Sequence, residues 1–198
     1  MKKFWKTTLA VAMSAFMAAS LAACGGSSSS SSEPANTESE APSGAIKIGG
    51  SGPLTGPAAV YGNAVKTAAE MAVEEVNAKG GVQFELQFED DKHDAEEAAT
   101  AFGTLMDGKM QISLATVTSA PGAAVAPLYQ ENQIFAITPS GSSPSVIYAD
   151  GEGQTGAYGS VCQMCFSDPN QGSGSATYIA AHPDLGTKVA VIYKNDTT

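Results

Sequence analysis

Two serine-containing segments hold the residues whose types and spacing are best suited to binding a small charged molecule. VTSAP (117–121) offers Thr118 and Ser119, and ITPSGSSP (137–144) offers three more serines. Each segment follows a short apolar run and precedes a predicted helix. The free N–H groups at a helix N-terminus favour an anion, and hydroxyl groups add donors without adding charge. The pattern therefore indicates a carboxylate site, while the alternative that these serines only cap helices stays open.

The other polar groups offer little for enzyme catalysis or metal binding. His182 precedes a proline at the end of a predicted helix, and His93 lies in EDDKHD (89–94), where helix capping explains the carboxylates. Lys92 opposes a cation there, and the glycine- and serine-rich segments lack the spacings of phosphate-binding loops and serine nucleophiles. We predict that the protein is not an enzyme and needs no cofactor or metal.

Composition limits the class of partner. The chain has 198 residues, of which 43% are hydrophobic, and this is enough to bury the core of one domain. Ten basic residues, all lysines, face twenty carboxylates and leave a net charge of −10. Such a surface repels phosphate backbones. We predict no nucleic-acid partner.

The first residues have the pattern of an export signal. Three lysines precede an apolar run (7–19) that is too short to span a bilayer as a helix. The predicted export signal ends in LAAC (21–24), which resembles the lipobox of bacterial lipoproteins. This resemblance implies a signal peptide at residues 1–23, acylation of Cys24, and a protein anchored by lipid to the outer, extracytoplasmic face of the cell membrane. A plain secretory signal with a chance cysteine is the alternative.

Residues 24–44 read as a flexible linker. They are rich in serine, glutamate, proline and glycine and contain no large apolar residue. About twenty such residues would hold a folded domain roughly 25 Å from the lipid.

From residue 45 onward, predicted strands and helices alternate. The strands are expected at 45–50, 82–90, 110–116 and 134–138, and the helices between the turn at 53–62 and Gly80, from Asp94 to Asp107, and at 122–132. This alternation predicts an α/β fold with a doubly wound parallel sheet and right-handed crossovers. A helix at 170–182 and a strand at 188–194 would begin a second series, so we expect the chain to be an N-terminal fragment of a longer protein.

Local patterns refine three of these elements. Strict alternation in 82–90 indicates a strand at the edge of the sheet, and small apolar residues between 65 and 76 form a stripe that should cover the sheet. Asp94 is expected to cap its helix with Glu97 as the reciprocal partner. That helix should bury four residues, namely Ala98, Phe102, Leu105 and Met106.

Cys162 and Cys165 form a C-x-x-C pair in the strand-like SVCQMCF (160–166). Residues three apart on a strand point to opposite faces, which disfavours both a disulfide and a shared metal. We predict buried, inert thiols.

Ligands of open parallel sheets bind beyond the carboxyl ends of the strands. This rule selects the loops at 51–60, 90–93, 117–121 and 140–144. It brings the two serine-containing segments to the same edge.

Four runs carry a resemblance to a known family. They are IKIGGSGPLTGPAAVYGNAVKTAAEMAVEEVNAKGGV (46–82), FEDDKHD (88–94), VTSAPGAAVAPLYQENQIFAITPSGSSP (117–144) and FSDPNQG (166–172). Together they resemble the branched-chain amino-acid-binding proteins of ABC transporters, which are periplasmic-binding proteins. The resemblance implies two lobes that close on an amino acid and deliver it to a membrane permease. Lobe 1 would span 45–167, mostly present, and lobe 2 would begin at 168–198.

The resemblance also implies ligand-binding residues. Ser119 matches a serine that binds the ligand carboxylate, and Ser142 matches a hydroxyl residue that contacts both charged groups. Ser140 matches a position whose main-chain carbonyl accepts from the ammonium group. Tyr61 matches a tyrosine that lines the side-chain pocket. Donors at one end, acceptors at the other and an apolar wall suit an amino acid.

Two departures from the family and one alternative function remain. The chain has no cysteines near His93 and Thr118, where some relatives have a disulfide, so that loop is expected to be held by packing alone. Gln163 stands where many relatives carry arginine, which puts the contacts near the hinge in doubt. The alternative function is a ligand-sensing receptor domain of the same fold, for amino acids or small amides.

Overall fold

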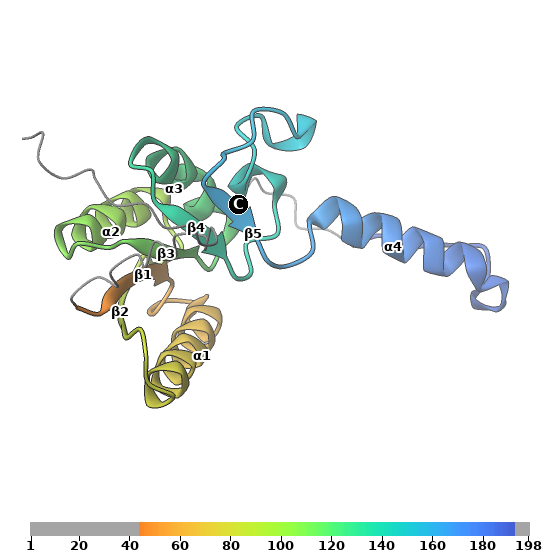
Figure 1. The fold of residues 1–198 in the computed structure, drawn as a ribbon. Helices are drawn as coiled ribbons and strands as arrows, with labels where there is room; N and C mark the ends of the chain where they lie inside the picture. The colour runs from red at the N-terminus through yellow and green to blue at the C-terminus, as the bar shows by residue number, and fades with distance from the viewer. Residues whose placement is uncertain (1–43, 193–198) are drawn as a thin grey trace, which may run out of the picture. The chain divides into compact units, whose positions relative to one another are not determined.

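The architecture is a five-stranded parallel sheet with helices on both faces (Figure 1). The computed structural model describes residues 44–192. The elements are β1 (Ile46–Gly52), α1 (Ala59–Ala78), β2 (Phe84–Asp90), α2 (Ala95–Asp107), β3 (Ile112–Thr116), α3 (Ser119–Glu131), β4 (Phe135–Thr138), β5 (Val161–Gln163) and α4 (Asp168–Ala181), with short 3-10 helices at Pro144–Val146, Gly151–Gly153 and Pro183–Leu185. The predicted α/β doubly wound sheet is confirmed.

The order of the strands determines where the candidate ligand-binding loops lie. The order is β2-β1-β3-β4-β5, and every neighbouring pair is parallel. The chain moves from β1 to β2 in one direction and then passes back beyond β1 to reach β3. Strand order therefore reverses between β1 and β3, and right-handed crossovers put α1 on one face and α2 and α3 on the other (Figure 1). Ligand sites of such sheets lie beside this reversal.

The main core lies between the sheet and the α2–α3 pair. Leu105 and Val125 are each 1% exposed, and the ring of Phe102 meets the ring of Tyr129 edge to face, with centroids 5.1 Å apart. The Tyr129 hydroxyl contacts Ser113 Oγ at 3.0 Å, and burial raises the pKa of Tyr129 to about 12. Of the four residues predicted to be buried on α2, three are, and Met106 is half-buried.

The stripe of α1 is less covered than predicted. Val65, Ala69 and Val73 are half-buried, whereas Val76 is 41% exposed. The reason is position, since α1 packs on β1 and on β2, the edge strand. The helix also begins at Ala59, inside the predicted turn, because Gly62 lets it approach Pro53: a Cβ on Gly62 would collide with the Pro53 carbonyl.

Helix α3 begins three residues earlier than predicted. Thr118 has an extended backbone (φ −116°, ψ 154°), and the helix starts at Ser119. Pro121 does not block this start, because the first turn of a helix needs no N–H partner there. Ser119 therefore lies in the helix and not in a loop.

The end of the described chain differs from the prediction. Residues 188–192 form neither helix nor strand, and Ile192 is 98% exposed. A strand needs a partner strand for its backbone groups, and this segment pairs with none within residues 44–192. The predicted signal peptide (1–23), Cys24 and all of the linker except Gly44 fall outside the described residues. The lobe boundary after residue 167 remains a prediction.

Within residues 44–192, no helix has the combined length and apolar character needed to cross a membrane.

Candidate ligand-binding site

The two serine-containing segments meet at the carboxyl edge of the sheet. The Ser143 N–H donates to Ser119 Oγ at 3.2 Å, which joins the second segment to the first turn of α3. The Ser140 hydroxyl donates to the Val117 carbonyl at 2.6 Å. The prediction that these segments lie together is thus confirmed by direct contacts.

Two buried threonines, which sequence reasoning missed, fix the shape of this edge. The Thr138 hydroxyl, fully buried, donates to the Thr116 carbonyl at 2.9 Å and accepts from the Gly141 N–H at 3.0 Å. The Thr116 hydroxyl donates to the Thr118 carbonyl at 3.1 Å. These bonds tie the end of β4 to β3 and hold the turn that carries Ser140 and Ser142. The signal in the sequence that could have found them is a threonine at the end of each of these two strands.

The serines of the second segment have different tasks. Ser143 accepts from the Ser145 N–H and caps the short helix Pro144–Val146, so for this serine the capping alternative holds. The exposed Ser140 uses its hydroxyl internally. Ser142 is half-buried; its carbonyl accepts from the Asp168 N–H at 3.0 Å, and its hydroxyl has no hydrogen-bond partner among residues 44–192.

The N-terminus of α3 presents open donors beside these serines. Thr118 occupies the N-cap position, but its side chain does not cap the helix. Pro121 has no N–H, and the Gly122 N–H bonds to the Thr118 carbonyl at 3.1 Å. Among the described residues, the N–H groups of Ser119 and Ala120 have no partner. The partial positive charge of this helix end is therefore available to an anion.

Tyr61 lies on α1, whereas Ser119 begins α3. It sits in the first turn of α1 and is 65% exposed. Within residues 44–192, no hydrogen bond joins it to Ser119, Ser140 or Ser142. Its predicted place in a side-chain pocket stays a prediction.

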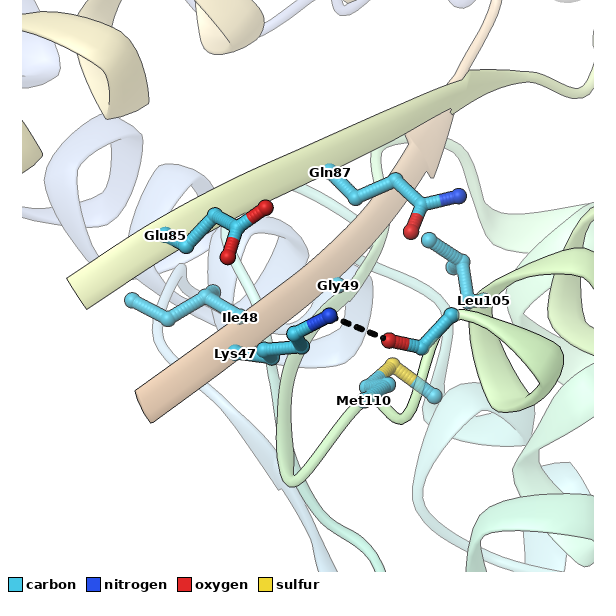
Figure 2. Close-up of a pocket in the computed structure, with 8 residues that line it drawn as sticks. Lys47, Ile48, Gly49, Glu85, Gln87, Leu105 and Met110 are labelled. Atoms are coloured by element: carbon cyan, nitrogen blue, oxygen red, sulfur yellow. Dashed lines mark hydrogen bonds between the residues drawn. The ribbon is translucent and has the colours of Figure 1, made fainter. Parts of the chain in front are cut away.

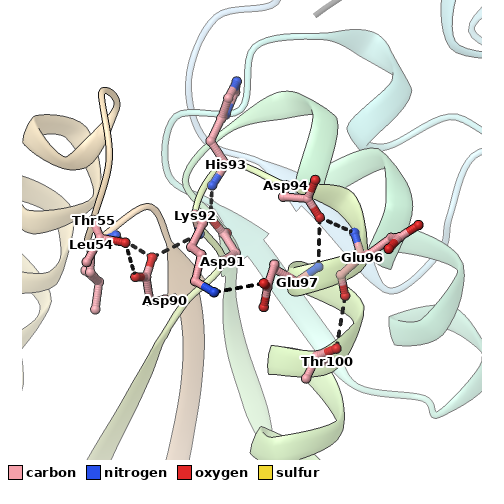
Figure 3. A network of polar contacts seen from close by, with 10 residues as sticks. All are labelled: Leu54, Thr55, Asp90, Asp91, Lys92, His93, Asp94, Glu96, Glu97 and Thr100. Atoms are coloured by element: carbon pink, nitrogen blue, oxygen red, sulfur yellow. Dashed lines mark hydrogen bonds and ion pairs between the residues drawn. The ribbon is translucent and has the colours of Figure 1, made fainter.

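The acidic segment after β2 is built from backbone contacts (Figure 3). Asp90 accepts from the Leu54 and Lys92 N–H groups and from the Thr55 hydroxyl, and although desolvation opposes it, these bonds hold the Asp90 pKa below its usual value. Asp91 is fully buried and accepts from the Ser51 hydroxyl and the His93 N–H, each at 3.0 Å. Burial raises the pKa of Asp91. Both carboxylates shape the loop.

Asp94 caps α2 as predicted. Its carboxylate accepts from the Glu96 N–H at 2.8 Å and the Glu97 N–H at 3.0 Å. The expected reciprocal bond from the side chain of Glu97 is replaced, because that carboxylate pairs with the Lys92 ammonium at 2.8 Å. The cap is confirmed and the full capping box is not.

Comparison with known proteins identifies the family. The sequence profile described as periplasmic binding protein matches residues 45–198. The chain belongs to the periplasmic binding protein family. It is 31% identical over 137 residues to the Leu/Ile/Val-binding protein BraC3 of Rhizobium johnstonii, an alignment that covers 68% of this chain and 35% of the relative.

Solved structures of periplasmic binding proteins share the fold. One is the branched-chain amino-acid transporter substrate-binding protein LivJ of Streptococcus pneumoniae in complex with isoleucine (28% identity, TM-score 0.61, covering 71% of this chain and 39% of that one). Another is the leucine-binding protein LivK of Thermotoga maritima (30% identity, TM-score 0.58, 71% and 38%). The chain thus spans no more than about two fifths of the length of these relatives.

Hydrogen bonds are present at both positions where this periplasmic binding protein departs from the family pattern. His93 Nδ1 lies 3.0 Å from Thr118 Oγ1, so a hydrogen bond helps to hold the loop. The prediction that packing alone holds it is wrong. Gln163 donates from Nε2 to the Gly141 carbonyl at 2.6 Å, and this supports the turn that bears Ser142. The amide at position 163 therefore has a structural contact of its own.

The prediction of buried thiols is wrong for Cys162. Its side chain is exposed, because it lies on β5, at the edge of the sheet, and adjacent residues of a strand point to opposite faces, so that Val161 faces the core and Cys162 does not. Cys165 is half-buried, lies beyond the end of β5, and contacts the Gly141 carbonyl through Sγ at 3.5 Å. Burial raises the pKa of the Cys165 thiol. Both cysteines are free.

A small hollow lies near the amino ends of β1 and β2 (Figure 2). Lys47 crosses it and donates to the Gly108 carbonyl at 3.0 Å, at the C-terminal end of α2. Its cavity volume is about 10 Å³, which is no larger than the space for one water molecule. This hollow is a packing feature of the sheet in this chain.

Proposed function

We propose that the whole protein is an extracytoplasmic solute-binding lipoprotein that captures a small amino acid, of the branched-chain type, between two lobes and delivers it to an ABC permease. The observation that carries this proposal is the junction of Ser119 with the 140–143 turn at the open N-terminus of α3. It lies at the carboxyl edge of the sheet, beside the reversal of strand order.

The junction supplies the groups that an amino-acid carboxylate needs. Ser119 Oγ already accepts from the Ser143 N–H, so its own proton is left to donate. The Ser142 hydroxyl and the N–H groups of Ser119 and Ala120 add further donors. None of these groups carries a charge, and the helix dipole supplies the attraction.

The opposite end of the ligand would use other parts of the site. The Ser140 carbonyl would accept from the ammonium group, while its hydroxyl stays on Val117. Tyr61, whose ring is exposed in this lobe, would form part of an apolar wall. The names of the relatives support leucine, isoleucine and valine as the first ligands to test.

The same proposal covers the place of the protein in the cell and the choice between transport and sensing. Acylation of Cys24 would anchor the protein by lipid on the outer face of the membrane, and the 24–44 linker would give it reach. Mass spectrometry of the membrane-extracted protein tests this, because a diacylglycerol adduct on Cys24 is expected. Permease genes beside the full reading frame would support transport, whereas a fused kinase or cyclase module would support the sensing alternative.

Calorimetry tests the ligand. Full-length protein is titrated with leucine, isoleucine and valine, and with leucinamide as the matched control that lacks the carboxylate. We expect the free amino acids to bind and the amide to bind at least tenfold more weakly, since hydrogen bonds to a charged group contribute about 1.5–3 kcal/mol. Equal binding of leucine and leucinamide would reject the carboxylate site, and no binding by any of them would reject the ligand class.

A further inference from the structure

The side chain of Thr118 points away from the helix that it begins. An N-cap hydroxyl normally accepts from the second or third N–H of its helix. In α3 the third residue is Pro121, so Ala120 offers the only N–H that Thr118 can cap. Instead, the hydroxyl of Thr118 lies 3.0 Å from His93 Nδ1, on the loop after β2. Self-capping and ligand binding would therefore compete for one donor.

The backbone of His93 is held in an uncommon conformation. Lys92 (φ 51°) and His93 (φ 63°) both lie in the left-handed region, which is unfavourable for residues with side chains. Asp90 accepts from the Lys92 N–H at 2.9 Å, and Asp91 accepts from the His93 N–H at 3.0 Å. Figure 3 shows the turn with His93 projecting from it. The surrounding carboxylates thus maintain the turn that directs the imidazole.

The turn is connected to the sheet on the side of α3. The Ser51 hydroxyl donates to Asp91 at 3.0 Å, and the Ser51 carbonyl accepts from the Val117 N–H at 3.1 Å. Ser51 and Asp91 are both almost fully buried. The backbone of His93 is therefore connected to the strand end that precedes Thr118, and the two side chains lie within hydrogen-bonding distance of each other.

We propose that His93 is a positioning residue that holds the Thr118 hydroxyl away from the α3 N-terminus and so keeps the Ala120 N–H open for the ligand anion. The effect on affinity rests on the proposed function, whereas the effect on the helix end does not. Without the imidazole, the Thr118 hydroxyl turns toward Ala120 and closes the helix end.

The first test needs no ligand. Amide hydrogen exchange of Ala120 is measured by NMR in full-length wild type and in His93→Gly, which accepts the left-handed backbone without strain. We expect about fivefold slower exchange in the variant, the factor that a cap of ordinary strength gives. His93→Gly combined with Thr118→Val, which removes the competing hydroxyl, should restore the wild-type rate. Unchanged exchange in His93→Gly overturns the proposal.

The second test measures affinity for leucine, the probe. His93→Gly should bind about fivefold more weakly, and adding Thr118→Val should bring affinity back toward wild type. Lys92→Gly is the matched control, since it alters the adjacent left-handed residue, whose ammonium pairs with Glu97 and not with Thr118. His93→Asn, whose amide can reach the same hydroxyl from a tolerated backbone, should resemble wild type.

The outcomes separate the two proposals. If the double variant binds as weakly as His93→Gly, the residue acts only on stability and the positioning role is wrong. If His93→Gly does not fold, amide exchange of Ala120 is measured in Thr118→Val alone. The proposal expects no change, because the removed hydroxyl was not capping the helix. If wild type binds none of leucine, isoleucine and valine, the proposed function fails while Ala120 exchange still tests His93.

Discussion

The N-termini of α2 and α3 have the same backbone geometry and opposite chemistry. Asp94 (φ −125°, ψ 139°) and Thr118 (φ −116°, ψ 154°) are both extended N-cap residues. Asp94 caps its own helix through two N–H groups, whereas Thr118 bonds to His93. The difference shows that an open helix end does not need a special backbone. It needs a partner that draws the capping side chain elsewhere.

The N-termini of α2 and α3 also differ in charge. The first turn of α2 holds Glu96 and Glu97, and that of α3 holds no acidic residue. Three carboxylates, with Asp94, already offset the positive end of the α2 dipole. The α3 end keeps its attraction for an anion because Ser119, Ala120 and Pro121 add no charge.

Closing α3 in the manner of α2 should have the largest effect. Thr118→Asp is expected to cap Ala120 and to place a carboxylate near the ligand carboxylate. Repulsion at about 4 Å in a partly buried site costs up to about 4 kcal/mol, and the N–H donor is lost as well. Leucine affinity of the full-length protein, measured by calorimetry, should therefore fall at least a hundredfold while the thermal midpoint stays the same or rises.

Thr118→Asn is the control for this prediction. Asparagine is as good an N-cap as aspartate but brings no charge. Its affinity should fall less than that of Thr118→Asp. Equal losses would mean that repulsion contributes nothing, and unchanged affinity in both would mean that the ligand does not use this helix end.

Removing the hydroxyls at the open end should have the next largest effect. In full-length protein, Ser119→Ala and Ser142→Ala should each weaken amino-acid binding by about 1.5–3 kcal/mol, because each removes a hydrogen bond to a charged group. Ser160→Ala is the matched control, since its hydroxyl contacts Gln130 at the amino end of β5, away from the site. Wild-type affinity in both test variants would reject the site.

The sequence predicted the parts of this comparison that depend on local chemistry. Alternating strands and helices imply that the carboxyl ends of β3 and β4 share an edge, so Ser119 and the 140–143 turn were expected together. Asp94 was recognised as a cap because an acidic residue before a helical pattern has one obvious use. Both inferences need only neighbours in the chain and the parallel sheet.

The open state of α3 could not be predicted in this way. It depends on a contact between Thr118 and His93, which are 25 residues apart, and on the left-handed turn that directs His93. A threonine before a helix is ordinarily read as its cap. The exposure of Cys162 and of half the α1 stripe was missed for a related reason, because a pattern shows which face is apolar and not how much of it is covered.

Removing the cap from the closed end should act on stability alone. Asp94→Ala is expected to lower the free energy of unfolding by about 1 kcal/mol, within the range measured for lost N-caps, because the Glu96 and Glu97 N–H groups lose their acceptor. Urea unfolding of the full-length protein measures this. Asp94→Asn, a cap of similar strength, is the control and should lose much less. A fall in leucine affinity in Asp94→Ala would contradict the separation of the two helix ends.

The smallest effect should come from Asp91, which supports the turn between the two ends. Burial raises its pKa in the folded protein, so the folded state holds this proton to higher pH than the unfolded chain does. The stability that this carboxyl contributes is therefore full below the unfolded value of about 3.9 and falls as pH rises through the folded value. In Asp91→Asn, which keeps an oxygen acceptor for the His93 N–H and places an amide N–H donor opposite the Ser51 hydroxyl in place of an acceptor, this fall should disappear.

The neighbouring carboxyl provides a control of opposite sign. The pKa of Asp90 is lowered in the folded protein, so its contribution is present above about 3.9 and is lost as pH falls through the folded value. Urea unfolding of the full-length protein across pH 3–7 should show Asp91→Asn gaining stability relative to wild type as pH rises, and Asp90→Asn losing it. The same slope for both variants would mean that burial of Asp91 does not govern its titration.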